Sequence, residues 1–425
     1  MHKGMKQILF QAIRLMRQHP FHAVISVTGT AVTIAFVMAV AMIYDFRTAD
    51  MAPEADRSRL MYAGDAATYR RSNHSDVNNG GIGRTAFQAL FDRLDGVEEV
   101  TWYRGVSKSI CGLPASQSTY NYFVRPVAAN WFSFFRYEFV AGRPFTAEEY
   151  DACRWVCVLT EHAALQLFGT TDAVGEELRI SFFPARVVGV VKDVNAIFQT
   201  AYADVFTPFS LENEDGYSGR TEGLRGIRRC VLKLSAGARP ADIRAEVQHR
   251  QDRLNSSTAE YAFELSSLYT HVGYTFFRDK NISASLVYGL LAMVLLIVPA
   301  INISGMTHAQ MQERVTEIAV RKAYGASNAS ILYRLFAENL LVVFAGGALG
   351  YLLSCLLVWL GRTWLFGTGD VELSGISVGG GLLLRPVLFG LVFVVCLLFN
   401  LLSVLLPAYM ASQRNIASTL KGEEK

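Results

Sequence analysis

The chain has 425 residues, of which 51% are hydrophobic and only 18% are charged. This composition and a mean hydropathy of +0.24 exceed what an ordinary soluble protein shows, and they indicate an integral membrane protein with two or three domains. The net charge is +3. The sequence has no concentrated group of basic residues with interleaved aromatic residues, and this argues against nucleic-acid binding.

Residues 1–20 are predicted to form an interfacial helix on the cytoplasmic face of the membrane. Their apolar residues follow one helical stripe, which consists of Ile8, Leu9, Ala12, Leu15 and Met16. The segment has no acidic residue, and its charges come from Lys3, Lys6, Arg14 and Arg17. Because basic residues favour the cytoplasmic side, we expect the N-terminus in the cytoplasm.

Four stretches contain no Asp, Glu, Lys or Arg and are long enough to cross a bilayer, which takes about 20 residues. They are residues 21–44, 282–303, 339–361 and 386–413. A central charge would cost roughly 2.5 to 3.5 kcal/mol, so its absence favours four transmembrane helices over buried soluble helices. Ala39 and Ala41 form an A-x-A pattern, but the long apolar run around them favours an uncleaved anchor over a signal peptide.

The polar region 45–281 between the first two spans is predicted to be a large extracytoplasmic α+β domain. Helical periodicity covers residues 84–94 and 241–254, and β-rich runs cover residues 155–160, 186–194 and 229–234. Two stretches rich in polar residues and glycine are predicted to be surface loops, and these are residues 72–83 and 212–226.

Four of the six cysteines lie in this domain, where an oxidising compartment would permit one or two disulfides. They are Cys111, Cys153, Cys157 and Cys230. The C-x3-C spacing of Cys153 and Cys157 lacks a nearby histidine or second cysteine pair, which argues against a zinc site. Cys355 and Cys396 lie in membrane spans and are expected to be packing residues.

The region 304–338 is predicted to be cytoplasmic and to contain a charged helix that ends at Gly325. The helix would place Met311, Val315 and Ile318 on one side. The charged residues that project elsewhere are Arg314, Glu317, Arg321 and Lys322, with Glu317 and Arg321 in the favourable i,i+4 order. This placement suggests a connector at the membrane face, and a solvated helix face is the alternative.

Beyond this region, a short extracytoplasmic loop is expected at 362–385 and a cytoplasmic tail at 414–425. Gly346 and Gly350 form a G-x-x-x-G pair that permits close helix approach, and a dimer contact there stays open. The short catalytic patterns G-I-S-V-G at 375–379 and S-T-L-K at 418–421 lack the structural context for catalysis, so we expect no enzyme activity. We expect His162 and His271 to be surface or packing residues rather than ligands.

Two groups of motifs stand out. One is EIAVRKAYGAS at 317–327, followed by Gly346, Gly347 and Gly350. The other lies in the predicted extracytoplasmic domain and consists of GRPFTAEEY at 142–150, VLTEHAALQLFG at 158–169, GEEL at 175–178 and RVVGVVKDV at 186–194. With these motifs the chain resembles the MacB/FtsX-type permeases of ABC transporters over nearly its full length.

The resemblance implies a multi-pass subunit of the bacterial inner membrane, with both termini cytoplasmic, that works as a dimer with a cytoplasmic ABC ATPase. The second permease is a copy or a paralogue, and a periplasmic adaptor or effector is a further candidate partner. The residues that would couple to the ATPase are Arg314, Glu317, Ile318, Arg321, Lys322 and Gly325. Because the sequence contains no G-x-x-x-x-G-K-[ST] phosphate loop, we expect ATP on a separate chain and no cofactor here.

Two further expectations concern how the spans work. They contain few polar groups able to line an aqueous path, Asn302 and Asn400 being the main exceptions, so transmission of motion is favoured over a solute channel. Spans one and two would continue outward as a stalk through residues 45–59 and 265–281, which Pro53 could interrupt. The alternative function is a membrane-anchored receptor or scaffold that binds a partner without ATP coupling.

Overall fold

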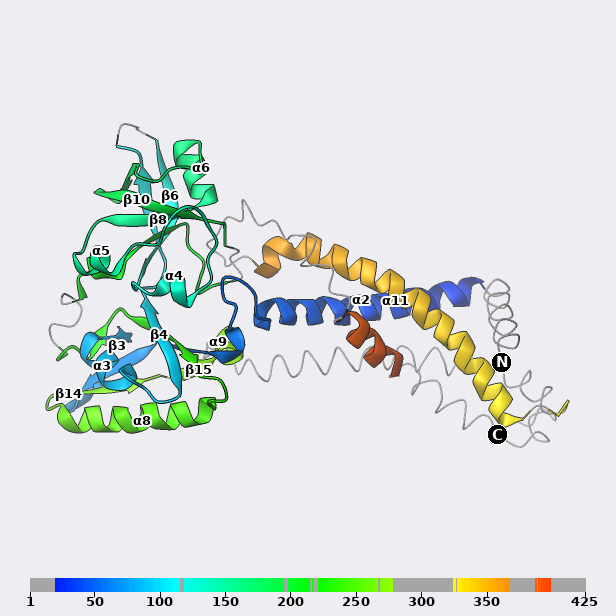
Figure 1. Cartoon of the computed structure of the whole chain (residues 1–425). Helices are drawn as coiled ribbons and strands as arrows, with labels where there is room; N and C mark the ends of the chain where they lie inside the picture. The colour runs from blue at the N-terminus through cyan, green and yellow to red at the C-terminus, as the bar shows by residue number, and fades with distance from the viewer. Residues whose placement is uncertain are drawn as a thin grey trace. The chain divides into compact units, whose positions relative to one another are not determined.

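The computed structural model divides the chain into two compact units (Figure 1). The described residues are 20–114, 118–194, 198–214, 216, 221–266, 268–277, 324–325, 327–366, 387 and 389–398. One unit contains the long apolar helices, and the other contains the described residues between Arg47 and Phe277. We call the second unit the globular domain.

Within the described residues, two helices of the first unit are long and apolar enough to cross a membrane. Helix α2 is Pro20–Thr48, and helix α11 is Asn328–Phe366. Their qualifying apolar stretches, Ala23–Thr48 and Leu340–Leu360, coincide closely with the first and third predicted spans.

The other predicted membrane segments fall largely outside the described residues. This is true of the interfacial helix at 1–20, the second span at 282–303, the loop at 362–385 and the tail at 414–425. The fourth predicted span is represented by the shorter apolar helix Phe389–Leu398. A domain of four transmembrane helices therefore stays a prediction.

Glycines of α11 allow this helix to approach α2 of the same chain closely. A Cβ atom added at Gly346 would lie 2.8 Å from Cβ of Thr30, and one added at Gly350 would lie 2.8 Å from the carbonyl oxygen of Ala31. Both distances are far shorter than an optimal van der Waals contact of about 3.5 to 4.0 Å. The close approach that the G-x-x-x-G pair makes is therefore intramolecular.

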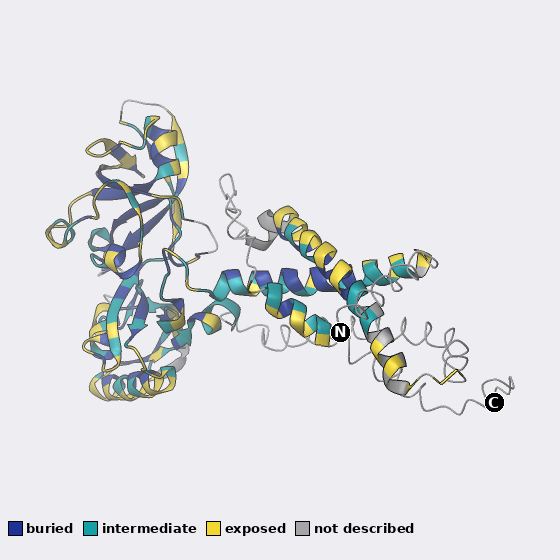
Figure 2. Cartoon of the chain, turned by 45° about the vertical axis from the view of Figure 1, so that its right-hand side comes forward, coloured by how far each residue is buried: buried dark blue, intermediate teal, exposed yellow. Residues whose placement is uncertain are grey.

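Another side of α11 is exposed, as the yellow parts of this helix in Figure 2 show, and it carries large apolar residues. Leu352, Leu356 and Leu360 recur every four residues and are 65%, 47% and 61% exposed. A contiguous apolar stripe of this kind is uncommon on a water-soluble surface, whereas hydrocarbon accommodates it without cost. The stripe therefore indicates a helix face that contacts lipid.

The globular domain has two lobes (Figure 1). The first, the α/β lobe, contains a four-stranded sheet in the order β12-β3-β2-β14. Helices α3 and α8 share one apolar core with this sheet. The elements are β2 (Ala66–Arg70), β3 (Asn73–Ile82), α3 (Arg84–Phe91), β12 (Arg225–Gly226), α8 (Pro240–Ser257) and β14 (Tyr261–Leu265).

A second group of strands belongs to a longer sheet and packs one face on the same core. These strands run antiparallel in the order β4-β13-β1-β15. Their bounds are β1 (Leu60–Ala63), β4 (Val97–Tyr103), β13 (Arg229–Leu234) and β15 (Leu268–Thr270), and the 3-10 helix η1 (Arg57–Arg59) precedes β1. Strand β1 thus lies between β13 and β15.

The second lobe, the barrel lobe, is a closed six-stranded barrel. Its strands follow the order β11-β8-β10-β9-β5-β6, and β11 also pairs with β6 in parallel, which closes the ring. The strands are β5 (Ser107–Gly112), β6 (Thr119–Val127), β8 (Val156–Thr160), β9 (Glu177–Ile180), β10 (Phe183–Val191) and β11 (Val205–Pro208). Around them lie α4 (Trp131–Phe134), β7 (Phe139–Gly142), α5 (Ala147–Asp151), α6 (Glu161–Phe168) and η2 (Phe209–Leu211).

An aromatic core joins the two lobes. It contains Tyr62 and Tyr103 from the long sheet and Trp131, Phe132 and Phe206 from the barrel lobe. In contrast, direct strand pairing between β4 and β6 is limited to one residue pair. The lobes are therefore held together mainly by side-chain packing.

The α+β prediction for this domain is confirmed. The expected helices are present as α3 and α8, and the expected strands as β8, β10 and β13, with ends that differ by a few residues. The two helices have apolar residues at helical spacing and the three strands are short runs rich in β-branched residues, so their sequence alone identifies them.

The prediction of a loop at 72–83 is wrong, because all but the two end residues of this segment form the ten-residue strand β3. Part of the segment at 212–226 also pairs with it as β12. The glycines that suggested a loop permit close backbone contact instead. A Cβ added at Gly81 would lie 2.7 Å from the carbonyl oxygen of Arg228, and one added at Gly83 would lie 2.1 Å from the carbonyl oxygen of Gly223.

We predict that Gly350→Ala lowers the stability of the helical unit by about 1 to 3 kcal/mol, because the new methyl group must displace α2. Thermal unfolding of the full chain in detergent measures the effect. The control is Gly390→Ala in helix Phe389–Leu398, where an added Cβ meets nothing within 4 Å. An equal change in the two variants would contradict the packing described above.

Candidate functional site

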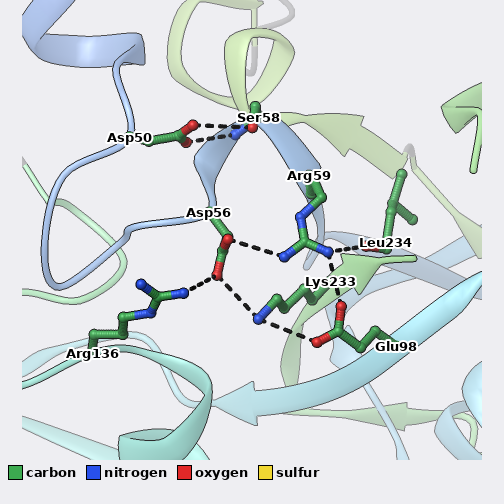
Figure 3. Close-up of polar contacts among 8 residues, drawn as sticks. All are labelled: Asp50, Asp56, Ser58, Arg59, Glu98, Arg136, Lys233 and Leu234. Carbon is green, nitrogen blue, oxygen red and sulfur yellow. Dashed lines mark hydrogen bonds and ion pairs between the residues drawn. The ribbon is translucent and has the colours of Figure 1, made fainter. Parts of the chain in front are cut away.

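The chain reaches the globular domain through a first connecting segment, residues 47–59, which follows α2. The helix ends at Thr48, and Asp50 then accepts hydrogen bonds from the backbone N–H of Ser58 at 3.0 Å and from its hydroxyl at 3.1 Å (Figure 3). These bonds fold the segment back on itself just before β1 begins. The path of the chain between Thr48 and β1 is therefore held by a local side-chain contact.

A second connecting segment, residues 268–277, lies beside the first. It consists of β15, which pairs with β1, and helix α9 (His271–Phe277). Nε2 of His271 lies 2.8 Å from the carbonyl oxygen of Arg47, and Nδ1 lies 2.9 Å from the hydroxyl of Tyr62. One imidazole thus bonds both the end of α2 and strand β1.

The partners of His271 define its tautomer. A carbonyl oxygen can only accept, so Nε2–H donates to Arg47, and the hydroxyl of Tyr62 donates to Nδ1 when the ring is neutral. Burial lowers the pKa of His271, which favours the neutral ring. Burial also raises the pKa of Tyr62 well above its ordinary value, so its proton is retained for this bond.

Aromatic contacts extend from α9 into the sheet. The ring of Tyr274 stacks on that of Tyr62 with centroids 4.4 Å apart and planes inclined by 15°. Its hydroxyl lies 3.4 Å from that of Tyr103 on β4. Stacked rings in van der Waals contact resist compression, so a shift of α9 would move β1 directly.

A buried ion pair attaches the first connecting segment to the barrel lobe. Nε of Arg57 lies 2.8 Å from a carboxylate oxygen of Glu54, and the two side chains are 1% and 2% exposed. The other oxygen of Glu54 accepts from the backbone N–H of Ala201 at 3.2 Å, and the guanidinium lies 4.5 Å above the ring of Phe198. Removing one member would leave the other charge buried without its partner, which is strongly destabilising.

A second ionic network surrounds Asp56 (Figure 3). This carboxylate lies 3.0 Å from the guanidinium of Arg59, 3.0 Å from Nζ of Lys233 and 3.5 Å from the guanidinium of Arg136. Glu98 on β4 shares Arg59 at 2.9 Å and Lys233 at 3.4 Å. The network therefore joins η1, β4, β13 and the turn after α4.

The charges of this network stabilise one another. Burial acts to raise the pKa of Asp56, but hydrogen bonds from Arg59 and Lys233 outweigh it and lower the pKa. The hydrogen bond from Arg59 likewise lowers the pKa of Glu98. Both carboxylates are therefore held ionised.

We call the two connecting segments, with the side chains that bind them, the junction.

The residues predicted to couple to an ATPase lie mostly outside the described part of the chain. Arg314, Glu317, Ile318, Arg321 and Lys322 are among them, so their roles stay predictions. Gly325 is described and has a φ of +85°, the left-handed conformation expected of a glycine that ends a helix.

All four cysteines of the globular domain are free thiols in the structure, so the disulfides that the compartment would permit are not present there. Burial is the physical reason that Cys230 stays apart, because it belongs to the core of the α/β lobe, whereas Cys111 and Cys157 belong to the core inside the barrel. Cys153 is exposed and its Sγ lies 3.4 Å from the carbonyl oxygen of Ser210.

Two other expectations meet the structure in the globular domain. The stalk is not continuous in the described parts of 45–59 and 265–281, because α2 stops at Thr48 and strand β15 precedes α9. Residues 278–281 lie outside the described residues. His271 is buried inside the globular domain. The junction itself was missed by sequence reasoning, because its members are separated by about 200 positions. The cluster of two acidic and two basic residues at 54–59 was the available signal.

We predict that the stability of the full chain in detergent falls at acidic pH partly through His271. The pKa of His271 is lowered on folding, because burial disfavours the charged ring. The neutral ring therefore makes its full contribution to the unfolding free energy above the unfolded pKa of about 6.5. That contribution is lost as the pH falls through the folded pKa. The variant His271→Gln should therefore have a shallower dependence of unfolding free energy on pH. His249→Gln, on the exposed surface of α8, should retain the parent slope; identical slopes for all three proteins would refute the assignment.

We also predict that Asp56→Asn lowers the unfolding free energy by about 1 to 2 kcal/mol, because it weakens charge-assisted hydrogen bonds at a partly buried site. Glu260→Gln is the matched control, since Glu260 pairs with Arg70 where the side chains are 55% and 43% exposed. Its effect should stay below about 0.5 kcal/mol. Chemical denaturation of the two variants side by side gives the comparison, and equal losses would contradict it.

Comparisons with known proteins cover most of the chain. Residues 23–250 match the MacB-like periplasmic core domain, and residues 289–416 match the FtsX-like permease C-terminal domain. The macrolide export ATP-binding/permease protein MacB of Escherichia coli (strain K12) is 25% identical over 235 residues, which cover 55% of this chain and 35% of that protein. The MacB protein of Shigella flexneri gives the same values. The matched region thus spans about a third of the length of these relatives.

Two solved structures are similar to the chain. The periplasmic region of MacB from Actinobacillus actinomycetemcomitans has a TM-score of 0.36 and 16% identity, and it covers 53% of this chain and 95% of its own. A domain of a putative permease protein from Porphyromonas gingivalis has a TM-score of 0.37 and 18% identity, and it covers 54% and 97%. The first family domain matches more than half of this chain, and the second matches its C-terminal part. The chain therefore belongs to the MacB/FtsX family of ABC transporter permeases.

Proposed function

We propose that this chain is a permease subunit that transmits ATP-driven movement of a separate cytoplasmic ATPase to an extracytoplasmic domain. The observation that carries the proposal is the junction, where one histidine bonds both the end of α2 and strand β1. The relatives are named ATP-binding/permease proteins, which supports an ABC ATPase as the energy source. The site for ATP would lie on that partner, since the phosphate-loop motif does not occur in this sequence.

The junction offers a short mechanical path into the domain. A displacement of α2 reaches Arg47 through the helix backbone and then passes to His271 and Tyr62. A displacement entering through α9 reaches the same strand through Tyr274. Because both connecting segments act on β1, their movements are combined before they spread into the sheet.

From β1 the path divides between the lobes. Strand β13 pairs with β1 over four residues and carries Lys233, which bonds Asp56. Arg136 and Phe198 attach the first connecting segment to the barrel lobe. The movement can therefore change both lobes, and this would allow the extracytoplasmic domain to act on a cargo or a partner protein.

On the cytoplasmic side, the proposal assigns ATPase contact to the charged segment around Ile318. The residues that would contact the ATPase are Arg314, Glu317, Arg321 and Lys322. Gly325 would end the helix that carries them. The apolar stripe of Leu352, Leu356 and Leu360 on α11 suits a helix that moves in lipid as a stiff rod rather than one that lines an aqueous pore. A second permease copy or paralogue would complete the unit.

We predict that the double variant Arg321→Glu/Lys322→Glu reduces co-purification of the ATPase by about tenfold or more, because two contacts become repulsive, each wrong charge costing on the order of 1 kcal/mol. The control reverses two exposed charges of the globular domain, Arg93→Glu and Arg253→Glu, and should leave co-purification unchanged. Unchanged co-purification in the coupling variant would contradict the assigned contact.

A second experiment tests transmission. With the complex in nanodiscs, ATP should change hydrogen exchange of residues 47–62 and 268–277, and Tyr274→Ala should abolish that change while the ATPase still binds. The reason is that the variant removes the ring that links α9 to β1. If the parent complex exchanges identically with and without nucleotide, the chain acts as a receptor or scaffold without ATP coupling.

A further inference from the structure

Strand β6 carries a buried guanidinium on the face that points away from the barrel interior. Arg125 is 2% exposed, and its neighbour Val124 belongs to the core inside the barrel. Because side chains alternate along a strand, Arg125 shares the opposite face with Val127, which belongs to the aromatic core that joins the lobes. In the part of the chain that the structure describes, no ion pair includes Arg125. A buried charge without an opposite charge is costly, so its other contacts must compensate for the lost water.

Backbone carbonyl oxygens take the place of a carboxylate around this guanidinium. Nη2 of Arg125 donates to the carbonyl oxygens of Gln199 and Tyr202, both at 3.0 Å, and Nε donates to that of Tyr202 at 3.2 Å. Nη1 lies 3.5 Å from the carbonyl oxygen of Arg104, which is its longest contact. Burial lowers the pKa of Arg125, but the ordinary value of about 12.5 keeps the group charged at neutral pH. Arg125 therefore binds two backbone segments through charge-assisted hydrogen bonds.

One of these segments is the turn at residues 198–202, which we call the 198–202 turn. The same turn holds the first connecting segment, because Glu54 accepts from the backbone N–H of Ala201 at 3.2 Å. The guanidinium of Arg57 also lies 4.5 Å from the centroid of the Phe198 ring. A single turn of the barrel lobe thus contacts both the buried guanidinium of β6 and the buried ion pair that follows α2.

The other segment is the linker between the lobes. Arg104 follows the end of β4 at Tyr103 and precedes β5, so the chain crosses from the long sheet to the barrel at this point. The backbone N–H of Arg104 donates to the carbonyl oxygen of Pro126 at 2.9 Å. The guanidinium of Arg125 also lies 5.0 Å from the centroid of the Tyr103 ring. It therefore fixes the 198–202 turn relative both to β6 and to the linker.

We propose that Arg125 is a positioning residue, which holds the 198–202 turn so that movement of the first connecting segment passes through β6 into the barrel lobe. The inference rests on the proposed function for the source of that movement. A guanidinium suits the role because its planar fork binds carbonyl oxygens in a fixed geometry, whereas a lysine is a point charge on a flexible stem. Strand β6 pairs with β5 and β11, so a shift of β6 reaches strands on both sides.

A positioning role and a purely structural role predict different results. If Arg125 served only the stability of the lobe, its substitution would speed hydrogen exchange in the barrel equally with and without nucleotide. If Arg125 positions the turn, its substitution removes the ATP-dependent difference in the barrel and leaves the difference at β1 and β13.

The experiment compares hydrogen exchange with and without ATP in the complex with the ATPase in nanodiscs. In the parent, ATP should change the exchange of residues 229–234 on β13 and of barrel residues 119–127 and 205–208. Arg125→Lys should reduce the change in the barrel by about fivefold or more, because the fork is lost, and should retain the change at 229–234. The control Val190→Ala, at a fully buried residue inside the barrel, lowers the stability of the lobe away from the turn and should retain both changes.

Two further measurements keep the test independent of one variant and of ATP. Phe198→Leu keeps Arg125 but removes the ring beside Arg57, so it should also lose the ATP-dependent change in the barrel. Without nucleotide, the amides of residues 198–203 should exchange about tenfold faster in Arg125→Lys than in the parent, because the carbonyl oxygens of the turn lose their hydrogen bonds. Thermal unfolding of each variant shows that it is folded.

The outcomes separate this inference from the proposed function. The positioning role alone would be overturned if both variants retained the ATP-dependent change in the barrel, if Arg125→Lys lost the change at 229–234 to the same extent, or if the parent responded at 229–234 but not in the barrel. A parent in which ATP changes nothing would refute the proposed function. The exchange of residues 198–203 without nucleotide would then decide by itself whether Arg125 positions the turn, and an unchanged rate in Arg125→Lys would reject it.

Discussion

The structure depends on the pair of hydrogen bonds that His271 makes to Arg47 and Tyr62. These bonds join the two places where the chain enters and leaves the globular domain, although the residues are more than 200 positions apart in sequence. One neutral imidazole thus links the second connecting segment both to the end of α2 and to strand β1. The arrangement makes the ends of the domain a single mechanical element.

The charged groups next to this element have a different role from ordinary surface pairs. Glu54 and Arg57 are buried together, and Asp56 collects three basic partners at the meeting point of both lobes. Isolated surface ion pairs contribute little, but a buried or networked pair is costly to break. The network therefore favours one fixed path for the chain over alternatives, which suits an element that must pass on displacement rather than absorb it.

The apolar helices α2 and α11 are also closely packed. Gly346 and Gly350 bring α11 so close to α2 that neither position could accept a side chain, and leucines occupy another face of α11. In hydrocarbon, close packing rather than the hydrophobic effect holds helices together, and small residues make that packing possible. The tightly packed helices and the hydrogen-bonded junction both support the proposed transfer of movement.

The amino-acid sequence by itself determined the membrane class, the long apolar helices α2 and α11, and strands and helices such as β13 and α8, because each of these depends on a periodic pattern within a short segment. It misjudged strand β3, where glycines that usually indicate a loop permit close backbone pairing. The barrel closure and the junction around His271 were decided only by tertiary structure. Each of them brings together residues distant in sequence, and local pattern contains no information about which distant segments will meet.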